Sequence, residues 1–241
     1  MTSTFKRTER KYVLTPEESK KMLALLGEKM DRDIFDTGNG YYVYNIYYDN
    51  ETNAVIRQSN QKPKYKEKLR VRSYEIPNED DNVFVEIKKK IFGVVNKRRI
   101  SIPIKCVDDF FENGTVPDLC DPVEKQIANE LLYFQKVYKT KPTLFLSYHR
   151  YAFSGKENKD FRVTLDFEVT TRRFDLDLKK GSYGESLIGK NCIMEVKFVD
   201  VMPVWLVDFF KENNILTRSI SKYGTEYARF RKSQLEEIIN V

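Results

Sequence analysis

Residues 66–72 read Lys66-Glu67-Lys68-Leu69-Arg70-Val71-Arg72. Because side chains alternate between the two faces of a β-strand, an extended chain here places its lysines and arginines together on one face. Glu67, Leu69 and Val71 then share the other face. The stretch therefore predicts a strand with one cationic face and one largely apolar face.

The same alternation recurs in other segments of the chain. It is seen at 84–90, 97–104, 161–167 and 193–198, and charged residues alternate in the same way at 7–11. The cations that fall on the charged faces are Arg7, Lys11, Lys66, Lys68, Arg70, Arg72, Lys88, Lys90, Lys97, Arg99, Arg150, Arg162 and Lys197. The acids that fall there are Glu9, Glu86, Asp166 and Glu195. Cations thus clearly outnumber acids on the predicted charged faces.

Two arrangements could accommodate these faces. An antiparallel sheet often keeps one face in water, so the charged faces could simply be solvated. However, like charges directly opposite one another destabilise a sheet, and a face of one sign is tolerated when something anionic occupies it. We therefore expect an α+β fold in which a closed β-barrel turns its charged faces inward as a tunnel and its apolar faces outward under helices. Closure would also remove the edge strands.

The composition points to a globular protein with an anionic partner. Of the 241 residues 41% are hydrophobic and 32% charged, and the net charge is +6. Met1–Arg10 lacks the apolar region of a signal peptide, and no run approaches the ~18 apolar residues that cross a bilayer, so we expect a cytoplasmic protein. The three cysteines, at 106, 120 and 192, lack metal-ligand spacing and suggest reduced thiols. The single histidine, His149, argues against histidine catalysis.

Patterning along the chain predicts one domain over residues 1–241. Thr15-Pro16-Glu17-Glu18 is typical of a helix start, with an N-cap threonine followed by proline, and Asp121-Pro122-Val123-Glu124 repeats the signal. Helices are expected at 15–29, 105–112, 121–137, 203–213 and 225–239. Strands are expected at 5–14, 41–49, 64–74, 83–91, 96–104, 143–152, 161–172 and 191–200, whereas 52–60 is ambiguous.

A tunnel lined by Arg and Lys is suited to polyphosphate. Arg offers paired donors to phosphoryl oxygens and Lys offers a mobile point charge. The acids on the same faces would coordinate Mg²⁺ or Mn²⁺, which prefer carboxylate oxygens and bridge to phosphates. Glu9, Glu86 and Glu195 are candidates for this role, and Asp166 would orient Arg162.

Several motifs resemble those of VTC-type polyphosphate polymerase domains. In chain order they are Arg7-Thr8-Glu9-Arg10-Lys11-Tyr12, Lys68-Leu69-Arg70-Val71-Arg72-Ser73-Tyr74, Val83-Phe84-Val85-Glu86-Ile87-Lys88, Ser147-Tyr148-His149-Arg150-Tyr151-Ala152-Phe153, Phe161-Arg162-Val163-Thr164-Leu165-Asp166, Met194-Glu195-Val196-Lys197 and Ser219-Ile220-Ser221-Lys222-Tyr223. That family belongs to the triphosphate tunnel metalloenzymes, of the CYTH-like superfamily. The resemblance therefore implies an eight-stranded antiparallel tunnel, ATP as phosphoryl donor, polyphosphate and ADP as products, and a requirement for Mn²⁺ or Mg²⁺.

The resemblance also implies roles for individual residues. Those that would hold phosphates are Lys11, Arg70, Arg72, Lys88, Lys97, Arg150, Arg162 and Lys222, and Glu195 would carry the metal. Surplus cations that would suit a track for a growing polymer are Lys66, Lys68, Lys90 and Arg99, and Lys197 is a further candidate for phosphate binding. Two positions depart from the pattern. Arg7 replaces the first acid of the Glu-x-Glu-x-Lys strand, which favours a polymerase over a hydrolytic triphosphatase. Ser219 stands where eukaryotic polymerases carry basic residues.

Three functions remain open from the sequence. A polymerase would take ATP and polyphosphate or pyrophosphate as partners, and we do not expect nucleic acid as a partner. A tunnel triphosphatase or cyclase would share the tunnel, the donor and the metal. A non-catalytic polyphosphate-binding module would gain nothing from the acids. The regulatory and membrane-spanning regions of the eukaryotic complexes are not expected in this chain, and any membrane-protein partner stays unidentified.

Overall fold

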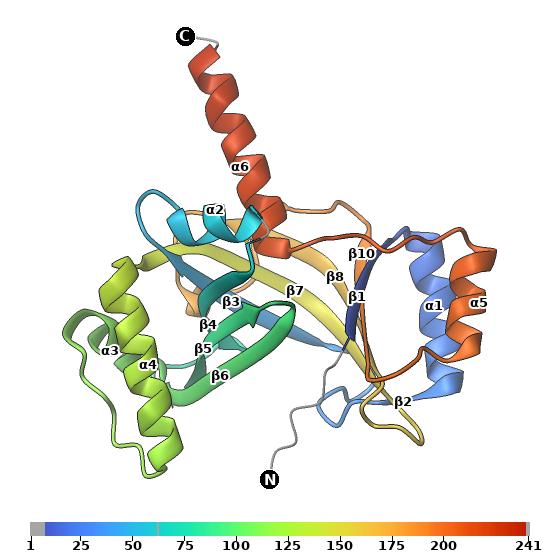
Figure 1. The fold of residues 1–241 in the computed structure, drawn as a ribbon, viewed down its shortest axis with the longest axis horizontal. Coiled ribbons are helices and arrows are strands. Elements are labelled where there is room, and N and C mark those ends of the chain that lie inside the picture. Colours follow the sequence, from blue (N-terminus) through green and yellow to red (C-terminus); the bar gives the residue numbers. More distant parts are fainter. Residues whose placement is uncertain (1–7, 62, 240–241) are drawn as a thin grey trace. The chain divides into compact units, whose positions relative to one another are not determined.

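The computed structural model describes residues 8–61 and 63–239 and is drawn as a ribbon in Figure 1. Its strands are β1 (Thr8–Leu14), β2 (Met30–Arg32), β3 (Tyr41–Asp49), β4 (Tyr65–Ser73), β5 (Asn82–Ile91), β6 (Val94–Pro103), β7 (Lys141–Gly155), β8 (Arg162–Arg172), β9 (Glu185–Ser186) and β10 (Cys192–Phe198). Its α-helices are α1 (Pro16–Lys29), α2 (Ala54–Asn60), α3 (Val107–Asn113), α4 (Pro122–Tyr138), α5 (Val204–Glu212) and α6 (Lys222–Ile239). The α+β class is therefore as expected.

The chain divides into two compact units, and each is built from separated segments. The first unit takes its described residues from Met1–Tyr42, Tyr148–Val169 and Ser186–Ser221. The second unit consists of Val43–Ser147, Thr170–Glu185 and Lys222–Val241, again as far as these residues are described. The expected single domain over residues 1–241 stays a prediction.

The sheet is antiparallel but open. In the first unit the strand order is β1-β10-β8-β7, with β2 beside β7, and in the second it is β7-β3-β4-β5-β6. Within the described part of the chain, β1 and β6 end these orders, so the prediction of a closed barrel was wrong. The alternation of charged and apolar residues determines which side of each strand is charged and which is apolar. Closure of a sheet into a barrel depends on strand tilt and stagger, which the alternation does not encode.

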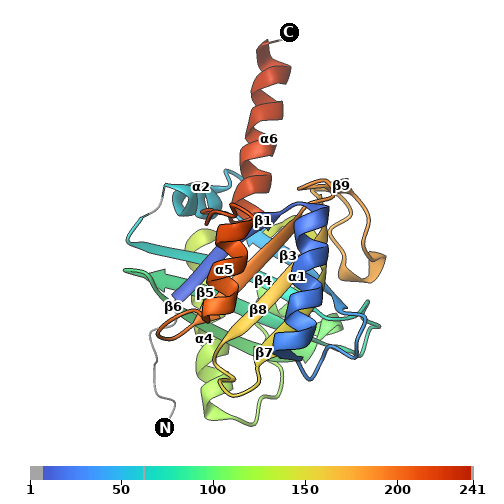
Figure 2. The same cartoon turned by 90° about the vertical axis from the view of Figure 1, so that its right-hand side faces the viewer.

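In the first unit the apolar side of the strands packs under two helices. α1 begins as predicted: the Thr15 hydroxyl accepts a hydrogen bond from the Glu18 backbone N–H, and the Glu18 carboxylate accepts one from the Thr15 N–H. Figure 2 shows α1 and α5 on the same side of β1, β10 and β8. Helix and strand residues share one core, which includes Met22, Leu26, Leu206, Phe210, Tyr12, Leu165, Met194 and Val196. The predicted helical cover over an apolar face is confirmed here.

In the second unit the apolar side of β4, β5 and β6 lies under α4 and α3. α4 contacts both β6 and α3, and Glu130 of α4 accepts a 2.9 Å hydrogen bond from Arg98 of β6. Phe111 of α3 packs against Tyr48 of β3 with ring centroids 4.6 Å apart. The buried residues of this layer include Leu69, Val71, Val85, Ile87, Ile100, Ile102, Phe110, Ala128 and Leu131.

Differences from the expected elements are confined to short segments and ends. The ambiguous segment 52–60 contains the helix α2, and the short strands β2 and β9 were not expected. α6 begins at Lys222 rather than at 225. The first three residues of the strand expected at 5–14, among them Arg7, lie outside the described residues. No helix in the described part of the chain is long and apolar enough to cross a membrane.

Candidate functional site

Strand register gathers cations on one side of β4, β5 and β6, three neighbouring strands of the second unit (Figure 1). Lys66 lies opposite Lys90, and Lys88 lies opposite both Lys68 and Lys97. We call the eight cations on this side the cationic face: Lys66, Lys68, Arg70, Arg72, Lys88, Lys90, Lys97 and Arg99. Like charges paired across strands cost stability, so this face favours an anionic ligand. The strand register places these eight residues on one face, as the alternation in the sequence predicted.

Glu86 is the acid that lies among these cations on β5. Its side chain is 1% exposed. One carboxylate oxygen accepts from Arg70 Nε at 2.8 Å and lies 2.7 Å from Arg70 Nη2, while the other accepts from Lys97 Nζ at 2.9 Å. Burial would raise the pKa of this carboxyl, but the charges of Arg70, Arg72 and Lys97 outweigh burial and hold the pKa well below its usual value. Glu86 is therefore an ionised, buried carboxylate that binds Arg70 and Lys97 of the cationic face.

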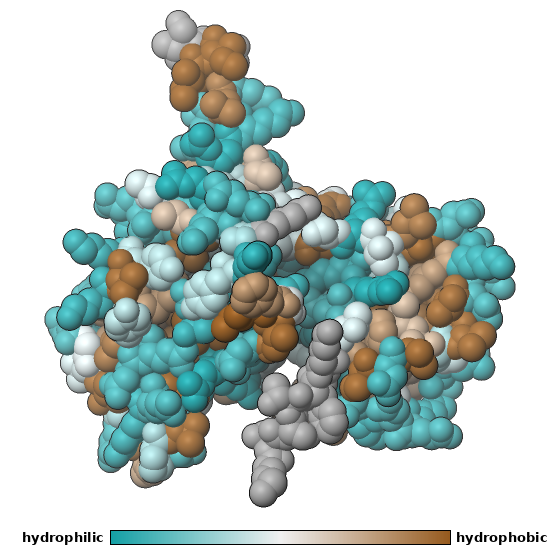
Figure 3. Space-filling model, in the orientation of Figure 1, coloured by the Kyte–Doolittle hydropathy of each residue, from teal (hydrophilic) through white to brown (hydrophobic). Residues whose placement is uncertain are grey.

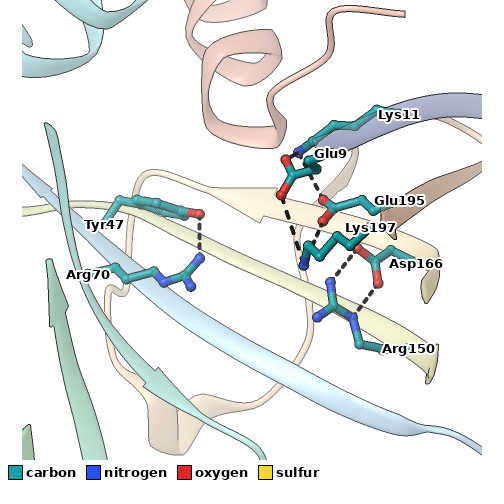
Figure 4. Close-up of polar contacts among 8 residues, drawn as sticks. All are labelled: Glu9, Lys11, Tyr47, Arg70, Arg150, Asp166, Glu195 and Lys197. Atoms are coloured by element: carbon teal, nitrogen blue, oxygen red, sulfur yellow. Dashed lines mark hydrogen bonds and ion pairs between the residues drawn. The ribbon is translucent and has the colours of Figure 1, made fainter. Parts of the chain in front are cut away.

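Two residues of β3, Asn45 and Tyr47, position the arginines. The buried Asn45 accepts from Arg72 Nε through Oδ1 at 2.9 Å and donates from Nδ2 to the Leu146 carbonyl at 2.9 Å. The Tyr47 hydroxyl accepts from Arg70 Nη1 at 3.2 Å (Figure 4). Sequence reasoning missed both residues as site residues. The signal was their register opposite Arg72 and Arg70, which becomes visible only once β3 and β4 are paired.

Tyr47 also shows how strong the positive field is. Burial would raise the pKa of its hydroxyl, yet the charges of Arg70 and Arg72 lower that pKa below the usual value. The Tyr47 ring packs on Tyr223 of α6 with centroids 4.7 Å apart, and the Lys68 ammonium lies 5.8 Å from the Tyr223 ring. Lys222, the predicted phosphate ligand that starts α6, adds its own positive charge near Tyr47.

The first unit carries a second charged group, which we call the carboxylate–lysine cluster: Glu9, Lys11, Glu195 and Lys197. Register places Lys11 opposite Glu195 and Glu9 opposite Lys197. Lys11 Nζ lies 2.9 Å from a Glu195 oxygen and 3.4 Å from a Glu9 oxygen. Lys197 Nζ lies 3.7 Å and 4.0 Å from the other oxygens of the same two acids (Figure 4). Two carboxylates and two ammonium groups thus alternate around one point of the sheet.

Arg150 lies on β7 in the same unit and is bound by Asp166 of β8. Its Nε and Nη2 donate to the two oxygens of Asp166 at 2.7 and 2.8 Å. Asp166 is completely buried. Burial would lower the pKa of the guanidinium, but the Asp166 charge raises the pKa well above its usual value. The sequence assigned Asp166 to orient Arg162, whereas both of its oxygens accept from Arg150.

Arg162 and His149 have other surroundings. Arg162 is exposed at the start of β8, opposite Lys197, and its Nε donates to the Lys159 carbonyl at 3.3 Å. The His149 ring packs against Tyr42 at 4.8 Å and Tyr151 at 5.1 Å. These ring contacts give His149 a packing role. Arg162 lies next to Lys197 of the carboxylate–lysine cluster, on the neighbouring strand.

Glu9 and Glu195 are the residues best suited to a divalent cation. Among the described residues, no three or more His, Cys, Asp or Glu side chains are grouped to hold a metal by themselves. Mg²⁺ and its relatives are, however, commonly bound by one or two carboxylates together with substrate phosphates. Glu9 and Glu195 share Lys11 and Lys197 as neighbours, so they supply such a pair. Glu86 is less suited, because its side chain is 1% exposed and Arg70 and Lys97 contact its two oxygens at 2.7 and 2.9 Å.

Comparisons with known proteins agree with this fold. The sequence model of the family described as the VTC domain matches residues 6–231. The structure of a candidate adenylate cyclase from Bacillus halodurans is similar, with a TM-score of 0.56 and 15% identity over 88% of this chain and 92% of that one. Another candidate adenylate cyclase, from Vibrio parahaemolyticus, has a TM-score of 0.45 and 11% identity over 93% of this chain and 98% of that one. A TM-score this low does not establish a shared fold. At 15% identity the first likeness shows a shared fold alone. A search of curated proteins found no match.

Proposed function

Because this chain belongs to the VTC domain family, we propose that it is a polyphosphate polymerase. It would transfer the γ-phosphoryl group of ATP to the end of an inorganic polyphosphate chain and release ADP. A cytoplasmic location, where ATP is made available, suits this reaction. Pyrophosphate or a short polyphosphate would serve as the first acceptor.

The observation that carries the proposal is the excess of cations on the cationic face. Its eight lysines and arginines share one side of three strands with one acid, Glu86, whereas Glu67 of β4 lies on the other side. The phosphates of one nucleotide do not need so many partners. A linear polymer of phosphates, in contrast, presents a negative charge at each repeat and can engage the whole face.

The arginines and lysines of this face have distinct tasks. Arg70 and Arg72 are held by Glu86, Tyr47 and Asn45, so their guanidinium groups have fixed orientations. A guanidinium held in this way recognises phosphoryl oxygens in pairs. Lys66, Lys68, Lys88 and Lys90 lie farther along the strands and supply mobile point charges for the polymer.

Within the first unit, the carboxylate–lysine cluster offers candidate ligands for the divalent metal that the proposed reaction would use. Glu9 and Glu195 would hold Mn²⁺ or Mg²⁺, and Lys11 and Lys197 would shift from these carboxylates to phosphate oxygens. The metal, when bound, neutralises charge that develops on the phosphoryl oxygens. Arg150, locked by Asp166, offers a further fixed donor on this side of the unit.

The proposed chemistry needs no general base. Phosphoryl transfer depends mainly on positioning and charge stabilisation, and the acceptor is a terminal phosphate that is already an oxyanion. The packing of His149 between aromatic rings is consistent with a reaction that does not use it.

The test is to identify the products of ATP by ³¹P NMR. With ATP and Mn²⁺ we expect ADP together with the signal of internal phosphates in a long chain. In the variant Lys66→Glu, the length of the polyphosphate product should decrease more than the rate of ATP consumption, because Lys66 lies at the far end of β4 from Arg72. Consumption of ATP with only orthophosphate as product, under varied acceptor and metal, would show a triphosphatase. Polyphosphate binding without any ATP consumption would show a binding module.

A further inference from the structure

The turn between β5 and β6 exposes a run of apolar side chains. We call residues 91–95 the hairpin tip. Ile91 is 43% exposed, Phe92 74%, Val94 47% and Val95 45%. In the space-filling view hydrophobic side chains gather over this turn (Figure 3). Exposed apolar clusters of this kind mark interaction sites more often than scattered single residues do, so the tip is a candidate contact surface.

The backbone of the tip makes Phe92 an unusual choice. Ile91 pairs with Val94, so Phe92 and Gly93 form a two-residue loop, and their φ angles are +45° and +90°. Turns with positive φ at both central residues favour Asn-Gly, and an aromatic residue is strained there. The Phe92 N–H donates to the Lys64 carbonyl at 2.8 Å, which fixes the turn beside β4. An exposed ring thus occupies a position where the local backbone geometry disfavours it.

The arms of the hairpin are strongly basic. Residues 87–99 contain Lys88, Lys89, Lys90, Lys97, Arg98 and Arg99 and no acid. Lys89 and Arg98 are paired with Glu130 on α4. Lys64 is exposed, and its ammonium lies 5.7 Å from the Phe92 ring. An apolar tip is therefore bordered by positive charge.

We propose that the hairpin tip docks on an anionic lipid bilayer, with the Phe92 ring and its aliphatic neighbours entering the head-group region. Apolar side chains gain free energy when they leave water for the acyl boundary, and lysines beside them are attracted to anionic head groups. A second copy of the same hairpin is a poor occupant because the basic arms of the two copies would repel each other. The docking needs no substrate, so it does not depend on the proposed polymerisation.

The test is flotation of the protein with vesicles of phosphatidylcholine mixed with the anionic lipid phosphatidylglycerol, against vesicles of phosphatidylcholine alone. Phe92→Asn removes the ring, keeps all charges and suits the turn. Phe35→Asn is the matched control, because Phe35 is also 74% exposed but lies between Asp33 and Asp36. Unfolding in urea checks that both variants are folded.

We expect the wild type and Phe35→Asn to float with the anionic vesicles and to bind neutral vesicles weakly. The partition coefficient of Phe92→Asn between anionic vesicles and water should be at least roughly tenfold lower than that of the wild type, which corresponds to the loss of one buried aromatic side chain. Lys64→Glu should also weaken flotation. Equal flotation of wild type and Phe92→Asn would overturn the proposal, because charge alone would then explain binding. Self-association of the lipid-free protein that Phe92→Asn abolishes would overturn it in favour of a second copy.

Discussion

Replacing Glu86 by glutamine removes the carboxylate that holds the cationic face together. The side chain is 1% exposed and contacts Arg70 at 2.7 Å and Lys97 at 2.9 Å. Removing one partner from a buried ion pair costs about 3–5 kcal/mol, because the other charges stay buried and uncompensated. The glutamine amide would also present N–H donors to groups that are donors themselves. We expect the free energy of unfolding, measured in urea, to fall by about this amount.

Glu51→Gln is the matched control in the same unit. Glu51 accepts a hydrogen bond of 2.9 Å from Lys141, as Glu86 does from Lys97, but its side chain is 82% exposed. Its replacement should leave the free energy of unfolding nearly unchanged. Tripolyphosphate should stabilise Glu86→Gln more than the wild type, since it replaces the lost negative charge and acts by mass action. A Glu86→Gln protein as stable as Glu51→Gln, with no larger response to tripolyphosphate, would refute the reasoning.

The same contacts predict how stability depends on pH. The pKa of Glu86 is lower in the folded protein than in the unfolded chain. Its contribution is therefore fully present above the unfolded carboxyl pKa of about 4.3 and is lost as the pH falls from there toward the folded value. In urea unfolding between neutral pH and pH ~3, the wild type should lose stability that Glu86→Gln has already lost. Parallel curves for the two proteins would contradict this assignment.

Further substitutions test other parts of the structure. Arg72→Ala should lower kcat/KM for ATP by roughly 10- to 150-fold, the value of one charge-assisted contact. Arg10 is exposed and lies on the opposite face of β1 from Lys11, so Arg10→Ala should change kcat/KM little. Equal losses for the two variants would argue against the cationic face as the phosphate site. Glu195→Gln should weaken Mn²⁺ binding measured by EPR and stop Mn²⁺-dependent turnover while the circular dichroism spectrum is kept; turnover within about threefold of wild type would favour Glu9 as the ligand. Phe92→Asn should raise the free energy of unfolding by about 1 kcal/mol because asparagine tolerates positive φ; a loss of stability would contradict the assigned turn. Tripolyphosphate should raise the Tm more than sulfate at equal ionic strength, and identical shifts would indicate a merely solvated face.

Much of the fold could be predicted because strand alternation is local. The period-two pattern of residues 66–72 and 84–90 assigned the cationic and apolar sides correctly, and the capping residues at Thr15 and Asp121 located two helices. Closure of the sheet could not be predicted in this way. It depends on whether the outermost strands meet, and nothing in the residues of one strand reports the register of a distant one.

The site was partly predictable for the same reason. The cations and acids are recognisable by their charge, but the residues that hold them are not. Asn45 and Tyr47 are uncharged, and their polar atoms acquire a role only when β3 pairs with β4. The partner of Arg150 was missed because a bidentate pair between β7 and β8 depends on their mutual register.

The spacing of the cations along β4 has a consequence for how a product would be handled. From Lys66 to Arg72 an extended strand covers about 20 Å, and the cations repeat at every second residue. A polyanion held at many weak points can give up one contact while the others retain it, since each rebinding is intramolecular. On the proposed function, the polymer would slide along this row instead of dissociating after each transfer. Elongation would then be processive, and a limited supply of ATP would yield a few long chains in preference to many short ones.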